Sequence, residues 1–124
     1  MQSFSANIYR DYSIPMSFHT TLQIAQTGDV SVEFESLSAQ LEILLQRDGI
    51  HRDLLTDLHD AFEQGEAICW VHAAYLFQLI SEIAPLTAPG SLEIRCLGEE
   101  FRHTWIMSVA AGRIEFSAGP WEYD

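Results

Sequence analysis

Cys69 and His103 have the side-chain types of a nucleophilic catalytic pair. Cys69 stands in GEAICWVHAAYLF, residues 65–77, and His103 opens HTWIMSV, residues 103–109. Helical spacing of apolar residues after Cys69 predicts that it lies at a helix start, where peptide dipoles favour a thiolate. Such a position beside an imidazolium can lower a cysteine pKa from ~8.5 to ~3.5–7.5. The base that a cysteine nucleophile needs commonly comes from another part of the fold, and His103 is the best candidate.

Hydrophobic periodicity outlines the elements that must position this pair. Residues 15–26 alternate apolar and polar side chains, which predicts a half-buried strand. A first helix is expected from about residue 30 to 47, capped by Asp29. A second is expected over 51–64, with Gly65 as its C-terminal cap. The expected apolar faces of the two helices consist of Val30, Phe34, Leu37, Leu41 and Leu44, and of Leu54, Leu55, Leu58 and Phe62.

The second half of the chain predicts a third helix and a small sheet. The helix runs from Cys69 until Pro85, with an apolar face of Cys69, His72, Leu76, Leu79, Ile80 and Ile83. A meander of three strands follows at Leu92–Leu97, His103–Val109 and Arg113–Ser117, with the turn AAGR between the last two.

The expected fold is therefore a single α+β domain of residues 1–124. Residues 1–64 would contribute the N-terminal strand and two helices. Residues 65–124 would contribute a cysteine-bearing helix packed on a three- to four-stranded antiparallel sheet. The early strand could join this sheet at an edge, which the sequence leaves open.

The charge of the chain excludes several classes of partner. Eighteen acidic residues against six basic ones give a net charge of −12 at pH 7, which repels nucleic acid and anionic membranes. This charge would steer the chain toward a basic partner, or serve solubility alone. No apolar run reaches the ~20 residues of a membrane span, and MQSFSANIYRDY lacks the features of a signal peptide. A cytoplasmic location with reduced thiols is expected.

The order of these residues resembles that of transglutaminase-like proteins, relatives of papain-type cysteine proteases. The matching residues are CW at 69–70, HTWI at 103–106 and GRIEFS at 112–117. Among small bacterial members, the leader-peptide proteases of lasso-peptide biosynthesis have a similar order of cysteine, helix, strand and histidine. The resemblance covers residues 65–124, about half of the chain.

The resemblance implies a thiolate at Cys69, a base or imidazolium at His103, and an acid on the third strand that orients the histidine. Where family members usually have aspartate, this chain has Ser117 followed by alanine. Glu115 is then the nearest substitute, and Glu122 and Asp124 are later alternatives. The implied reaction is attack on an amide bond of a peptide or protein, which leads to cleavage, deamidation or amide transfer without a cofactor.

Each of these residues also has a structural role to weigh. Free cysteines are among the most buried residue types, so Cys69 could equally be a core residue, and Cys96 is expected to be one. Trp70 and Trp105 are candidate substrate-binding residues, although such tryptophans are more often core aromatics.

A zinc site would require Cys69, His72, Cys96 and His103 around one ion. These are suitable ligand types, but their spacing is not that of paired Cys-x-x-Cys knuckles. No metal is therefore predicted.

Two functions remain open on the sequence alone. The first is a small cysteine hydrolase or acyltransferase that acts on an amide bond. The second is a non-enzymatic acidic binding protein, of the immunity or inhibitor type, that captures a basic protein. A solvent-open Cys69 sulfur within about 4 Å of a His103 nitrogen favours the enzyme, whereas a buried Cys69 favours the binding protein.

Overall fold

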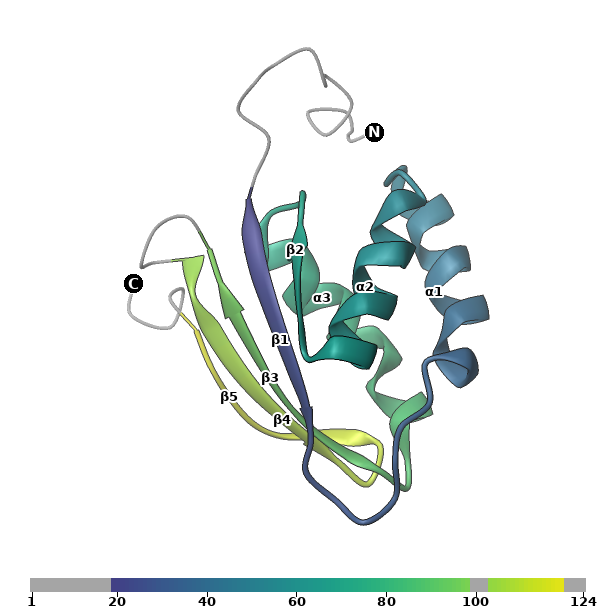
Figure 1. Cartoon of the computed structure of the whole chain (residues 1–124), viewed down its shortest axis with the longest axis vertical. Helices are drawn as coiled ribbons and strands as arrows, with labels where there is room; N and C mark the ends of the chain where they lie inside the picture. Colours follow the sequence, from purple (N-terminus) through teal and green to yellow (C-terminus); the bar gives the residue numbers. More distant parts are fainter. Residues whose placement is uncertain (1–18, 99–102, 120–124) are drawn as a thin grey trace.

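The computed structural model describes residues 19–98 and 103–119, in which helices cover one face of a five-stranded antiparallel sheet (Figure 1). The α+β class is confirmed, with five strands instead of three or four. The elements are β1 (Thr20–Gln26), α1 (Glu35–Asp48), α2 (Asp53–Gln64), β2 (Glu66–Cys69), α3 (Ala73–Ile83), the 3-10 helix η2 (Ala84–Thr87), β3 (Ser91–Leu97), β4 (Trp105–Ala110) and β5 (Arg113–Ala118).

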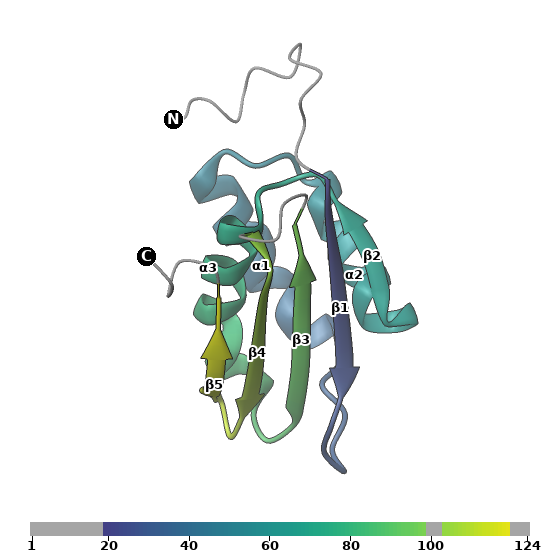
Figure 2. The same ribbon diagram turned by 90° about the vertical axis from the view of Figure 1, so that its left-hand side faces the viewer.

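The sheet has the strand order β2-β1-β3-β4-β5, and each neighbouring pair is antiparallel. Figure 2 shows its open face, with all three α-helices behind it. Alternate side chains of the three central strands β1, β3 and β4 therefore face the helices and are removed from water. The buried side chains of the three central strands are Thr20, Leu22, Ile24, Leu92, Ile94, Cys96, Trp105, Met107 and Val109.

The N-terminal strand is confirmed where the structure describes it, but its place in the sheet is not an edge. β1 pairs with β2 on one side, through Thr20 opposite Cys69, and with β3 on the other, through Leu22 opposite Cys96. Its interior position fits the burial of alternate residues. Residues 15–18 of the predicted strand lie outside the described residues.

The start of the first helix differs from the prediction. α1 begins at Glu35, after Phe34, and no side chain caps it. Asp29 precedes the helix by several residues and cannot be its cap, and Val30 is 48% exposed. The predicted apolar spacing holds from Phe34 onward, because Leu37, Leu41 and Leu44 are buried.

The second helix ends as expected, and an unpredicted strand follows it. Gly65 has a left-handed φ of 89°, which glycine adopts at little cost, and its N–H donates to the carbonyl of Ala61 (2.9 Å). The chain then enters β2 and reaches the third helix only at Ala73. A strand of four residues is too short to show its own period beside the helical spacing of the residues that follow.

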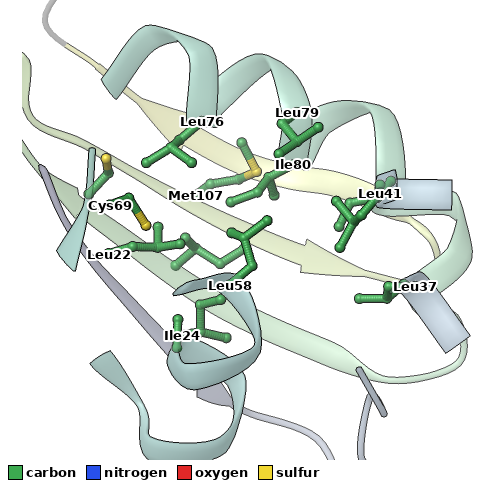
Figure 3. Close-up of a cluster of buried hydrophobic side chains, with 14 of the residues drawn as sticks. Leu22, Ile24, Leu37, Leu41, Leu58, Cys69, Leu76, Leu79, Ile80 and Met107 are labelled. Carbon is green, nitrogen blue, oxygen red and sulfur yellow. The ribbon is translucent and has the colours of Figure 1, made fainter. Parts of the chain in front are cut away.

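The C-terminal meander is confirmed, with β4 beginning at Trp105 and not at His103. The turn between β4 and β5 has positive φ angles at Ala111 (55°) and Gly112 (76°). This geometry matches the right-handed twist of the two strands in a tight hairpin. Figure 3 shows the core between sheet and helices, to which Cys69, Leu22, Leu76 and Met107 all belong.

Candidate functional site

Cys69 is a core residue at the end of β2. It has 0% exposure and belongs to the hydrophobic core between the sheet and the helices (Figure 3). The predicted position at a helix start is wrong, because three residues separate Cys69 from Ala73, where α3 begins. Cys69 therefore does not have the predicted position in which the peptide dipoles at a helix start would stabilise its thiolate.

The electrostatic setting of Cys69 opposes ionisation. Burial, together with the negative charge of Asp57, raises the pKa of the Cys69 thiol to about 12. A cysteine nucleophile needs the opposite change, since the thiolate is the reactive form. Both properties that were expected to favour the enzyme, access and a low pKa, are absent at Cys69.

The residue that does stand at the start of α3 is His72. It has an extended backbone (φ −69°, ψ 145°), and its Nδ1 accepts a hydrogen bond from the Ala74 N–H (2.9 Å). This bond satisfies one of the free donors of the first helical turn. The spacing of His72 from Leu76 predicted that both lie on one helix face, but it did not predict that His72 is the N-cap.

His103 reaches the start of α3, where it contacts His72 and not Cys69. The two imidazole rings are edge to face, with centroids 4.5 Å apart. Burial, followed by the effect of His103, lowers the pKa of His72. The chain just before β4 therefore meets the start of α3, and the residue at that helix start is an imidazole and not the predicted cysteine.

Glu115 does not lie beside His103. Its carboxylate pairs with Arg113 (3.2 Å), near the hairpin that connects β5 to β4. Ile114 is opposite Val109 and Phe116 is opposite Ser108, so Glu115 lies about 12 Å along β4 from Trp105, where the strand begins, at ~3.3 Å per residue. The alternatives Glu122 and Asp124 lie outside the described residues.

The two candidate substrate-binding tryptophans have different environments. Trp105 is 1% exposed, and its indole N–H donates to the carbonyl of Ala73 (2.8 Å). It joins β4 to the first turn of α3 and is a core residue. Trp70 is 58% exposed and lies edge to face with His19, with ring centroids 5.1 Å apart.

The zinc alternative has no support in residues 19–98 and 103–119. No three histidine, cysteine or acidic side chains there are placed to hold one metal ion. His72 also uses Nδ1 as an acceptor, so its neutral ring carries the proton on Nε2 and neither nitrogen is free to bind a metal.

Sequence reasoning missed an acidic row on α2 that the structure brings beside β2. We call Asp53, Asp57 and Asp60 the acidic flank; their spacing of four and three residues places them on one side of the helix. The opposite side of α2 faces the start of α1, because His59 and Phe62 contact Phe34 with ring centroids 5.0 and 5.6 Å apart.

The charges of the acidic flank act on one another and on β2. Burial, together with Asp60 and Asp53, raises the pKa of Asp57. Because α2 packs against β2 and the opposite side of the helix faces α1, the flank lies on the β2 side of α2. Asp57 in turn contributes to the raised pKa of Cys69. The total charge of the chain was evident from composition, but its location beside β2 depends on the fold.

Comparison of the chain with protein-family models, curated proteins and solved structures found no match. The transglutaminase-like resemblance therefore stays a prediction. None of the helices in the part of the chain that the structure describes has both the length and the apolar character needed to cross a membrane.

Proposed function

We propose that this protein is a non-catalytic acidic binding protein that captures a basic protein partner. The acidic flank of α2 is the observation that carries the proposal. Its three carboxylates occupy neighbouring positions on one helix side, at a cost in helix stability of about 0.2–0.5 kcal/mol for each like-charged pair. A basic partner would relieve this repulsion, and the charge would speed its encounter with the protein.

The distribution of arginine supports this proposal. Each arginine in the described residues already has a carboxylate partner, through the ion pairs Arg47–Asp48, Arg47–Glu82, Arg52–Glu42, Arg95–Glu93 and Arg113–Glu115. Within residues 19–98 and 103–119, none of these arginines pairs with the acidic flank. Within the flank, Asp53 lies 3.4 Å from His51 Nδ1, whereas Asp57 and Asp60 have no cationic partner among the described residues and are available for cations from another molecule.

The burial of Cys69 favours binding over amide-bond chemistry. A thiol with 0% exposure and a raised pKa cannot reach a peptide carbonyl without rearrangement of the core. The proposed location is the cytoplasm, where the two free cysteines would stay reduced.

The cavity found in the core among the described residues does not support a small-molecule site. A cavity lined by residues such as Leu58, Leu79 and Ile94 has a volume of about 10 Å³. Ligand pockets are typically ~300–1,000 Å³, so this cavity does not offer an alternative function.

The proposal is tested by titrating the ¹⁵N-labelled protein with polyarginine and comparing two charge-matched variants. The first replaces Asp53, Asp57 and Asp60 with asparagine. The second removes the same charge elsewhere, by replacing Glu33 and Glu35 with glutamine and Asp29 with asparagine. We expect shifts concentrated on α2 and weaker binding only in the first variant. Equal binding by both variants would show that total charge alone attracts the cation, and would contradict the proposed site.

A further inference from the structure

β2 is an edge strand with unpaired backbone groups. The Ile24 N–H donates to the Gly65 carbonyl (3.1 Å), and the register continues through Leu22–Ala67 and Thr20–Cys69. Hydrogen-bonded pairs alternate in an antiparallel ladder. The N–H and C=O groups of Glu66 and Ile68 therefore point away from β1, where no strand pairs with β2 in the described part of the chain.

The side chains along this edge are unusually apolar for an exposed strand. Ile68 is 43% exposed and Trp70 is 58% exposed, while Cys69 between them is buried. Ile68 and Trp70 consequently lie on the open face of the sheet. Figure 2 shows β2 at the outer edge of the sheet, with α2 behind it. The edge thus has Ile68 and Trp70 on one side, together with Glu66 at the start of the strand, and the acidic flank of α2 on the other.

We propose that β2 is a strand-addition site for an extended segment of the basic partner. Such a segment would form backbone hydrogen bonds with Glu66 and Ile68 and become a sixth strand. Successive side chains of a strand point to opposite faces. One set would contact Ile68 and Trp70, and the other would meet the acidic flank, so the segment should alternate apolar and basic residues.

Charge complementarity selects this occupant over a second copy of the chain. A second β2 would bring another acidic flank and another Glu66 to the same edge, in a protein of net charge −12. Like charges brought together in this way oppose association. This inference rests on the proposed function and names the form of the partner segment.

The test uses two capped synthetic peptides with the same composition. One has the alternating order Arg-Val-Arg-Val-Arg-Val, and the other has the block order Arg-Arg-Arg-Val-Val-Val. We expect the alternating peptide to bind about tenfold more tightly in calorimetry. It should also slow hydrogen exchange of the Ile68 amide, because this N–H points to the free edge. Methylation of alternate peptide nitrogens in the alternating sequence should remove both effects.

Ile68→Pro tests the edge from the protein side. Proline is tolerated on edge strands where the N–H faces solvent, and it removes the donor that the peptide needs. We expect Ile68→Pro to lower the affinity for the alternating peptide by about tenfold. Ile68→Thr retains the N–H and should lower this affinity less. If Ile68→Pro does not fold, strand addition is still tested by hydrogen exchange of the Ile68 amide in the unmodified protein and by binding of the N-methylated peptide.

The outcomes separate this inference from the proposed function. One outcome is that both peptides bind equally, that Ile68 is not protected from exchange, and that neutralising the acidic flank abolishes binding. This outcome would overturn strand addition but leave the proposal of a basic partner in place. Binding of neither peptide at low salt would overturn both proposals. If the peptide still protects the Ile68 amide from hydrogen exchange after the flank is neutralised, strand addition at β2 would stand. The requirement for basic residues in the partner would be overturned.

Discussion

The imidazole rings of His72 and His103 meet edge to face, with centroids 4.5 Å apart, where α3 is capped and the chain enters β4. A transglutaminase-like arrangement would place a cysteine at this helix start, opposite the histidine. Here Cys69 precedes the cap by three residues and lies in the core. Among the described residues, His103 therefore faces an imidazole and not a thiol, which is why we propose binding instead of catalysis.

Stability should fall as the pH is lowered through the range in which histidine titrates. Burial and His103 lower the pKa of His72 in the folded protein, so the unfolded chain binds the proton more readily. The contribution of neutral His72 is complete above the unfolded value of ~6.5 and is lost as the pH falls toward the lower folded value. A protonated ring also cannot accept the Ala74 N–H.

Urea unfolding at several values between about pH 7.5 and pH 5.5 measures this dependence. His72→Asn retains a capping acceptor without a titrating group and should flatten the curve. An identical pH dependence in His72→Asn and the unmodified protein would contradict the prediction.

Alkylation of Cys69 should be slow in the native protein. The thiol has 0% exposure and a pKa of about 12, so little thiolate is present and reagent cannot reach it. We expect iodoacetamide to modify Cys69 rapidly only after unfolding in urea, with no effect of His103→Ala on the native rate. Mass spectrometry of the digested protein measures this rate. Rapid modification near about pH 6 that disappears in His103→Ala would restore the enzyme hypothesis.

The two tryptophans should respond differently to phenylalanine. Trp105→Phe removes the hydrogen bond to Ala73 and reduces volume in the core, so the free energy of unfolding should decrease by about 1–3 kcal/mol. The matched change at the exposed Trp70 should alter it by less than about 0.5 kcal/mol. Chemical unfolding of both variants measures the difference, and equal losses would argue against a core role for Trp105.

Tyr75 should stabilise the contact between α3 and the end of α1 through Asp48. Its hydroxyl donates to Asp48 Oδ2 (2.8 Å), and Arg47 bridges Asp48 and Glu82. Burial alone would raise the pKa of Asp48, but the hydrogen bonds from Arg47 and Tyr75 outweigh it and lower the pKa. Tyr75→Phe should therefore cost about 1–2 kcal/mol of stability.

A double-mutant cycle identifies the interaction responsible for that cost. If the hydroxyl acts through Asp48, Tyr75→Phe should cost much less in a background that carries Asp48→Asn. Additive losses in the double variant would assign the cost to packing of the ring instead.

Local periodicity was sufficient to predict most of the fold. The alternation through Leu22 and Ile24 predicted β1, and the spacing from Leu37 to Leu44 predicted the body of α1. Both patterns arise within the element, since burial of one face imposes a period of two on a strand and about 3.6 on a helix. The start of α1 was misplaced because Val30 continues the helical spacing outside the helix.

The amino-acid sequence by itself determined the residue types, the acidic charge and the outline of the main elements. Only the tertiary structure decided what surrounds the chemical groups. Pairing of β2 with β1 buries Cys69, and packing of α2 places the acidic flank beside the free edge. These outcomes depend on contacts between segments far apart in the chain. A four-residue strand between two helices shows no period of its own, so its position is set by the partner with which it pairs.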